Sequence, residues 1–268
     1  MADLQFKNSP RFVLALSDSL VMIRRSATHI IRNTDQLLGT FFQPIMFLVL
    51  FSAVFGGSIS KALPPNVSYL NFLMAGIIIQ TVAFGSTTTA LAVANDLKKG
   101  IVDRFRSLPM DNLAVLNGHV ISDLFRNSIS TLVMIIAGLV MGFRSSASFL
   151  DWIYIAGIVL LFTLTFSWLS AILGVIAKSV EGVQWLTFVI IFPLTFASSA
   201  FTPTADMNKY LRAFAENQPI TQIIQAVRSL MLNEPIGNYG RNTILWCVGI
   251  LIIAIPTASY LFKKKTTQ

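Results

Sequence analysis

Long apolar stretches separated by short polar segments dominate the chain from residue 36 onward. A helix that crosses the ~30 Å hydrocarbon layer needs about 20 mostly apolar residues, and a charge at its centre costs about 2.5–3.5 kcal/mol. The uncharged stretches therefore predict six transmembrane helices, and an even number places both termini on the same side. The predicted spans are about 37–57, 69–94, 121–142, 152–177, 182–202 and 242–262, within a transmembrane domain of residues 36–262.

The segment of residues 1–35 has a helical pattern but is not a span, because Asp18, Arg24 and Arg25 interrupt its apolar positions. Apolar residues that recur every three or four positions predict a helix with one apolar face, which suits the headgroup layer of a membrane. A soluble helix packed on a partner protein is the alternative. We expect a cytoplasmic interfacial helix here.

Residues 96–109, between the second and third spans, mix charges of both signs with apolar positions. Within this segment, Gly100 and Pro109 bracket a short amphipathic stretch, and such residues break helices at their ends. The pattern predicts a short cytoplasmic helix whose apolar side chains need a docking surface on another protein. A solvated loop that folds back on the headgroups is the alternative.

The region of residues 203–240, after the fifth span, is too apolar for a free loop. Its stretch PITQIIQAVRSLML is too short to cross a bilayer and reads as an interfacial or re-entrant helix. Pro193, Pro203 and Pro219 interrupt the backbone around it. We therefore expect the fifth span to end early and a helical hairpin to dip into the outer leaflet.

Composition and charge support this interpretation. Of 268 residues, 54% are hydrophobic and 12% charged, and the mean hydropathy is +0.68. A soluble chain carries about 25% charged residues, so the fold class is all-α integral membrane, and an ordinary soluble domain is excluded. Because the net charge of +8 is spread over so few charged residues, lipid is a better partner than nucleic acid.

The positions of the basic residues predict the orientation. Cytoplasmic loops hold an excess of Lys and Arg. With the N-terminus inside, fourteen of the 20 basic residues fall on the cytoplasmic side and six on the other. Both termini are therefore expected in the cytoplasm, and residues 263–268 form a basic tail that anchors this topology.

The sequence carries little chemistry of its own. The single cysteine, Cys247, cannot form an internal disulfide or a cysteine-based metal cage, and no metal site is predicted. No phosphate-binding loop is present, and His29 and His119 stand alone in the sequence. Asp123 and Arg126, three residues apart at the inner end of the third span, are expected to pair. Among membrane transport functions, a passive pore or a transporter powered by another protein remains.

Two stretches are similar to a known family. DLKKGIVDRFRSLPMDNLAVLNGHVISDLFR resembles the cytoplasmic coupling-helix region of daunorubicin-resistance-type ABC-transporter permeases. FPLTFASSAFTPTADMNKYLRAFAENQPITQIIQAVRSL resembles the outer-side motif of the same type-2 ABC exporter family, and the likeness covers nearly the whole chain. One departure is the usual Met-Pro of this motif, which here reads Met207–Asn208 and affects only the local turn.

This resemblance implies a permease subunit in the bacterial plasma membrane that has no cofactor of its own. A separate cytoplasmic ATPase would bind ATP and Mg, and a second permease subunit, identical or homologous, would complete the transporter. The residues implied to dock on the ATPase are Gly100, Asp103, Arg104, Phe105, Arg106, Leu108 and Pro109. Those implied to shape an outer re-entrant gate are Pro193, Ser198, Phe201, Pro203, Gln218, Pro219 and Arg228.

The family likeness suggests a hydrophobic or amphipathic cargo of the drug or antibiotic type, exported by alternating access. The uncharged, Phe-rich spans offer no fixed ion to select a strongly charged solute. Candidates for lining the path, if they do not simply pack against lipid or other helices, are Phe41, Phe42, Phe47, Phe51, Phe84, Phe188 and Phe192. Alternatives are export of a lipid-linked glycan or wall polymer, and a membrane anchor or immunity or sensor protein that transports nothing.

Overall fold

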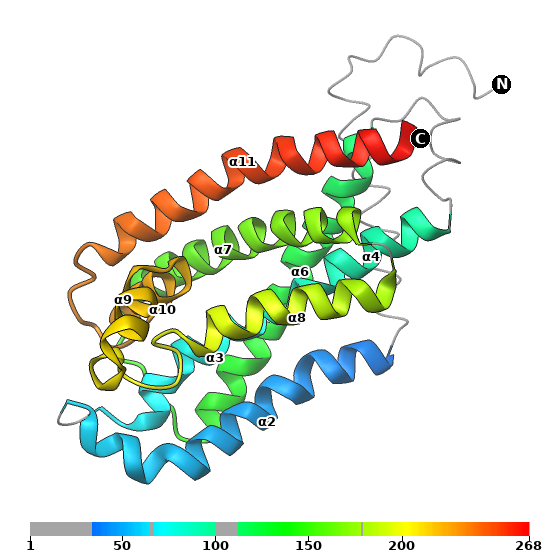
Figure 1. Cartoon of the computed structure of the whole chain (residues 1–268). Coiled ribbons are helices and arrows are strands. Elements are labelled where there is room, and N and C mark those ends of the chain that lie inside the picture. The colour runs from blue at the N-terminus through cyan, green and yellow to red at the C-terminus, as the bar shows by residue number, and fades with distance from the viewer. Residues whose placement is uncertain (1–33, 65–66, 100–111, 178, 268) are drawn as a thin grey trace.

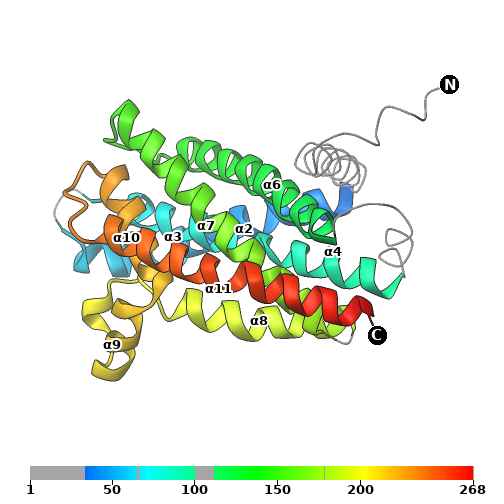
Figure 2. The same ribbon diagram turned by 90° about the horizontal axis from the view of Figure 1, so that it is seen from above.

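The computed structural model describes residues 34–64, 67–99, 112–177 and 179–267, and the regular structure in these ranges is helical throughout. The helices run side by side as an elongated bundle (Figures 1 and 2). Its long elements are α2 (Thr34–Ile59), α3 (Tyr69–Gly85), α4 (Thr87–Lys98), α6 (Asn112–Val140), α7 (Phe149–Ile176), α8 (Val180–Phe196) and α11 (Tyr239–Thr267). The short ones are η2 (Ser60–Ala62), η3 (Thr204–Asp206), α9 (Lys209–Asn217) and α10 (Pro219–Met231).

Within the described residues, five helical stretches are long and apolar enough to cross a membrane. They are Phe42–Ala62, Tyr69–Lys98, Val115–Val140, Phe149–Ile176 and Tyr239–Lys265. An all-helical, multi-pass membrane protein is thereby confirmed. The predicted fifth span, 182–202, corresponds to α8, which has only 17 residues and a length of about 26 Å at 1.5 Å per residue.

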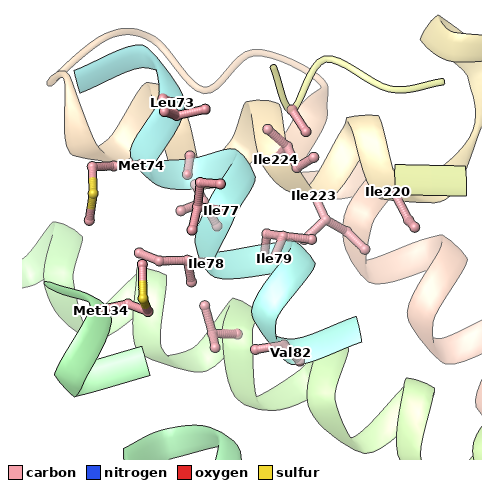
Figure 3. Close-up of a cluster of buried hydrophobic side chains, with 14 of the residues drawn as sticks. Leu73, Met74, Ile77, Ile78, Ile79, Val82, Met134, Ile220, Ile223 and Ile224 are labelled. Carbon is pink, nitrogen blue, oxygen red and sulfur yellow. The ribbon is translucent and has the colours of Figure 1, made fainter. Parts of the chain in front are cut away.

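The central element of the bundle is α3. Its sequence is apolar on every side, which is typical of a helix surrounded by other helices, and nearly all of it from Phe72 to Ala83 is buried. Figure 3 shows Ile77, Ile78 and Ile79 of α3 between side chains from α6 and α10. Neighbours therefore enclose α3, whereas α2 and α11 keep long exposed apolar faces.

The predicted second span is interrupted, which the sequence pattern did not indicate. α3 ends at Gly85 and α4 begins at Thr87, with Ser86 between them. The amide of Ser86 still donates to the carbonyl of Val82 at 3.0 Å. The amide of Thr89 donates to the carbonyl of Ser86 at 3.1 Å, whereas in a continuous helix it would donate to the carbonyl of Gly85. The span is a broken helix with two halves.

The predicted early end of the fifth span is confirmed. α8 stops at Phe196, one turn after Pro193, and a short non-helical segment leads through η3 to α9 and α10. These two helices meet at Gln218 as a helical hairpin at one end of the bundle, near the start of α11 (Figure 1). The last residues of α4 and α11 lie at the opposite end (Figure 1).

Two predicted segments fall largely outside the described part of the chain. Of the interfacial helix predicted over residues 1–35, only the last two residues are described, and they begin α2. Of the coupling segment predicted over 96–109, Asp96 to Lys98 belong to the last turn of α4, and residues 100–109 lie outside the described residues.

Candidate functional site

Arg228 of α10 holds together three elements at the hairpin end of the bundle. Its side chain is only 4% exposed, and its guanidinium lies 3.6 Å from the centre of the Phe72 ring. Nε donates to the Phe72 carbonyl of α3 at 3.0 Å, and Nη2 donates to the Ser199 carbonyl, after α8, at 2.6 Å. Nη1 donates to Gln225 Oε1 at 3.2 Å. Arg228 thus ties α10, α3 and the segment after α8 together.

Gln218 completes the end of α8. Its Nε2 donates to the carbonyls of Leu194 and Ala197, both at 2.8 Å. The last carbonyls of a helix have no partner within the helix, so a side-chain donor at this position caps it. The hydroxyl of Tyr69 likewise donates to the Phe201 carbonyl at 3.0 Å. The turn after α8 is therefore held by side chains of α3 and α10.

The structure brings most of the predicted gate residues together. Ser198, Phe201, Gln218 and Arg228 are all buried at the hairpin end of the bundle, and we call them the outer cluster after the side on which the sequence predicts them. The three prolines lie at its borders and are less buried, with Pro193 inside the last turn of α8 and Pro219 at the start of α10. Tyr69, Phe72 and Ser199 also contribute to this cluster, although the sequence pattern does not single them out. A polar residue at the start of an apolar span is too common a feature to have singled out Tyr69.

A continuous row of aromatic rings connects α8 with α2 through this cluster. Neighbouring ring centres lie 4.9 Å apart for Phe188 and Phe192, 4.2 Å for Phe192 and Phe196, and 4.8 Å for Phe196 and Phe201. Phe201 stacks on Phe51 of α2 at 4.4 Å. Phe51 in turn contacts Phe47 at 6.0 Å and Phe55 at 5.5 Å. We call these seven rings the aromatic row.

The aromatic row contains four of the seven predicted path residues. Phe47 and Phe51 are partly buried, whereas Phe188 and Phe192 are 48% and 38% exposed. Phe42 points outward with 70% exposure, and Phe84 of α3 packs against the buried core instead. The side chain of Phe41 lies outside the described part of the structure. Phe55, Phe196 and Phe201 join the row, although the sequence analysis did not place them in the path.

A pocket adjoins the outer end of the aromatic row. It lies between the end of α2 and the segment that follows Phe201. Its lining residues are Ser58, Ile59, Ala62, Thr202, Pro203, Asp206 and Met207.

The predicted pair of Asp123 and Arg126 is confirmed, and it is buried inside the bundle. The guanidinium of Arg126 donates to the Asp123 carboxylate and also to the Gly85 carbonyl at 2.6 Å. The hydroxyl of Ser167, on α7, donates to the other oxygen of Asp123. The two charges lie within the candidate span Val115–Val140, and only 1% and 6% of their surfaces are exposed.

The other end of the bundle carries two polar contacts between helices. His119 is not alone, as its Nε2 lies 3.0 Å from Oδ2 of Asp96 and joins α6 to α4. Two residues 23 positions apart could not be paired from the sequence. Lys265 of the basic tail donates to the carbonyls of Val175 and Ala177 at the end of α7, where a cation also suits the helix dipole.

The coupling residues Gly100, Asp103, Arg104, Phe105, Arg106, Leu108 and Pro109 lie outside the described residues. In the described ranges, no three His, Cys, Asp or Glu side chains gather as metal ligands would.

Comparisons with known proteins agree with one another. The chain matches the family described as ABC-2 type transporter over residues 18–232. It is 28% identical over 261 residues to the daunorubicin resistance ABC transporter permease protein DrrB1 of Streptomyces coeruleorubidus, covering 97% of this chain and 90% of the relative. It is 24% identical over 217 residues to the doxorubicin resistance ABC transporter permease protein DrrB of Mycobacterium tuberculosis, covering 78% and 74%. Since the family match spans most of its length, this chain belongs to the ABC-2 type transporter family.

Proposed function

We propose that this chain is the membrane half of an ATP-powered exporter that moves hydrophobic or amphipathic compounds of the drug or antibiotic type out of the cell. As an ABC-2 membrane permease subunit it lacks a nucleotide-binding domain, and ATP hydrolysis belongs to a partner ATPase. The cargo class is inferred from the aromatic row and from the names of the relatives.

The aromatic row is the observation that carries the cargo assignment. Aromatic rings bind flat apolar molecules by stacking, and their faces attract cations, so a row of them suits amphipathic drugs better than ions or sugars. The row runs from Phe188 and Phe192, which are partly open, to the buried Phe201 and the partly buried Phe51. It ends beside the outer pocket near Asp206. The row thus offers a continuous apolar path toward that end of the bundle.

A second permease subunit would close this path on its open side. α2 and α8 both expose large apolar side chains beside the row, among them Leu50 at 49% and Val189 at 61%. A closed dimer buries the same surface on both subunits about a two-fold axis. We infer that the α2 and α8 faces of two subunits meet across the path, and that the exposed faces of α6 and α11 meet lipid.

We assign the orientation from the basic residues at one end of the bundle. Lys98, Lys99 and the tail lysines Lys263–Lys265 lie at one end, which we assign to the cytoplasm. α8 then serves as a span in addition to the five long candidates. Its 17 residues fall a few ångströms short of the hydrocarbon layer, and the folded segment after Phe196, capped by Gln218 and Arg228, completes the crossing.

The hairpin of α9 and α10 would form the outer re-entrant gate. α10 is buried over most of its length, whereas α9 exposes Tyr210, Leu211 and Phe214. Arg212 donates to Glu216 at 2.7 Å, and this hydrogen bond holds the pKa of the Glu216 carboxyl below its ordinary value. A short helix with an apolar face and a charged pair suits the headgroup layer of the outer leaflet.

The cytoplasmic segment of residues 100–109 would dock on the ATPase, as the resemblance implies. Closure of two ATPase subunits around ATP would then draw the two coupling segments together and rock the bundles, which opens the outer side.

Reconstitution with the partner ATPase tests this function. The chain and its partner ATPase are purified together, placed in proteoliposomes and supplied with ATP and Mg on the ATPase side. We expect ATP-dependent movement of doxorubicin across the bilayer and faster ATP hydrolysis when doxorubicin is present. The matched control is the same complex with an ATPase whose catalytic base has been replaced.

Two results would contradict the proposal. The first is a complex that neither moves doxorubicin or other amphipathic dyes nor changes its ATP hydrolysis in their presence. The second is ATP hydrolysis by the purified chain alone.

A further inference from the structure

The span Tyr69–Lys98 has one break, and a charged side chain from another helix occupies it. A continuous helix would give the Gly85 carbonyl the amide of Thr89, but that amide bonds to Ser86 instead. The freed carbonyl accepts from Arg126 Nη2 at 2.6 Å and from the Thr88 hydroxyl at 3.0 Å. Broken helices persist inside membranes where neighbouring side chains take up the freed backbone groups. Arg126 and Thr88 are the two side chains that donate to the freed Gly85 carbonyl.

The pair of Arg126 and Asp123 extends this contact to a third helix. Arg126 donates to Asp123, which in turn accepts from Ser167 of α7. The network therefore joins the end of α3, the middle of α6 and the middle of α7. Ionisable groups inside a membrane domain are rare because they are costly, and those that occur usually have a function. The path of aromatic rings does not use this pair.

A second polar group beside the break lacks a partner. Asn127, next to Arg126, is fully buried, and neither its amide nitrogen nor its amide oxygen has a hydrogen-bond partner among the described residues. Gly85 leaves the room for it, since a Cβ there would lie 2.1 Å from Asn127 Oδ1. An unpaired buried amide is unfavourable, which favours a second arrangement of the break in which Asn127 is paired.

The two halves of the broken span end at the two ends of the transporter. α3 reaches the outer cluster, where the Phe72 carbonyl accepts from Arg228 and Gly76 lies against the backbone of Ala200. α4 reaches the opposite end, where Asp96 contacts His119 just before the proposed coupling segment. Movement at the coupling segment can therefore reach the outer cluster through this one broken helix. The angle between α3 and α4 at Ser86 determines how far the movement is transmitted.

We propose that Arg126, held by Asp123, is a positioning residue that sets the angle of the break and so couples ATP hydrolysis to the outer gate. This inference rests on the proposed export function. Its alternative is that the two charges only neutralise each other and take no part in transport.

Two variants separate these explanations. Arg126→Lys keeps both charges, but the lysine side chain is shorter and ends in a compact ammonium, so it does not place a donor where Nη2 of Arg126 contacts both Asp123 and the Gly85 carbonyl. Asp123→Asn with Arg126→Gln removes both charges at once, so neither is left unpaired in the bundle. The matched control is Phe125→Ala, next to Arg126 on the same helix, whose side chain is 61% exposed and faces away from the break.

Each variant is purified with the partner ATPase and reconstituted, and doxorubicin movement is measured together with ATP hydrolysis. We expect both variants to reach the membrane and bind the ATPase within about twofold of wild type. The doxorubicin moved per ATP should fall at least tenfold in both, while Phe125→Ala keeps the wild-type ratio.

The outcomes distinguish this inference from the proposed function. A wild-type complex that moves no doxorubicin overturns the proposed function, and this inference with it. A wild-type complex that transports, together with variants that keep the wild-type ratio, overturns this inference alone. Loss of both variants from the membrane would assign the pair to folding and would also overturn it.

Discussion

Arg126 and Arg228 are buried cations that each donate to a backbone carbonyl of another segment. Arg228 has no carboxylate within salt-bridge distance among the described residues, and its strongest contacts are the carbonyls of Phe72 and Ser199. Carbonyl oxygens carry a partial negative charge, and the Phe72 ring adds its electron-rich face. The guanidinium of Arg228 uses all three of its nitrogens on different groups, which the single nitrogen of a lysine cannot reproduce. Arginine is therefore the residue suited to position 228.

Replacing Arg228 should damage the outer cluster and leave the ATPase interface intact. Arg228→Ala leaves buried carbonyls without a donor, which costs about 1–3 kcal/mol of stability. We expect a lower unfolding temperature in detergent and at least a tenfold loss of doxorubicin transport, with unchanged ATPase co-purification. Arg212→Ala is the control, since that exposed arginine pairs only with Glu216 and its loss should change little. Loss of ATPase binding in Arg228→Ala would show that the orientation is wrong.

At the scale of elements, close backbone contact fixes where the helices cross. A Cβ on Gly76 of α3 would lie 2.3 Å from the Ala200 carbonyl oxygen, and one on Gly174 of α7 would lie 2.4 Å from that of Ala90. Small residues let membrane helices approach closely enough for dispersion forces to hold them. These two glycines therefore set the distance of α3 from the turn after α8, and of α7 from α4.

An added methyl group should be costly at one glycine and harmless at another. Gly76→Ala forces the Ala200 backbone away, and we expect a loss of about 1–3 kcal/mol, as for overpacked cores. Gly157→Ala, in the middle of α7, meets nothing within 4 Å and should be neutral or slightly stabilising. Thermal unfolding of the two variants in the same detergent compares them. Equal unfolding temperatures would contradict the tight contact at Gly76.

The proposed coupling segment gives a second prediction at this scale. Phe105→Ala with Leu108→Ala removes the apolar side chains expected to dock on the ATPase. We expect normal insertion into the membrane but weaker association with the ATPase, measured by co-purification. Phe214→Ala, on the exposed face of α9 at the other end of the bundle, serves as the control. Unchanged co-purification in the double variant would refute the coupling assignment.

The whole molecule is a bundle with two different ends and an incomplete side. Polar side chains tie the hairpin of α9 and α10 to α3 and α8 at one end, and contacts at Asp96 and Lys265 tie α4, α6, α7 and α11 at the other. Between the ends, α2 and α8 flank the aromatic row and leave its apolar face open. We therefore propose that a single chain forms one wall of a path.

A two-fold pair of this chain predicts a cross-link between subunits at this face. In a Cys247→Ser background, one tagged copy carries Leu50→Cys and a differently tagged copy carries Val189→Cys, both near the middle of their helices. A bismaleimide should join the two tags on one band. Ile252→Cys in place of Val189→Cys is the control, because its exposed face on α11 should meet lipid. Absence of the product, or equal product in the control, would exclude the proposed pairing.

Much of the fold could be predicted from the sequence, because the bilayer restricts the possibilities. Length and hydropathy alone placed the long helices, and Pro193 followed by an apolar stretch of 14 residues indicated the early end of α8 and the helix of α10. The break at Ser86 escaped notice because Gly85 and Ser86 are tolerated inside many spans. α6 begins nine residues before its predicted span, since Asn112 to Val120 mixes polar and apolar positions.

The sequence by itself determined the class of protein and the pairing of Asp123 with Arg126, since each depends on neighbours along one helix. Only the tertiary structure decided which distant groups meet: Arg228 with Phe72, Asp96 with His119, and Phe201 with Phe51. The physical reason is that the hydrophobic effect places helices in a bilayer without choosing their neighbours. That choice rests on close packing and on hydrogen bonds between helices, which are properties of the assembled bundle.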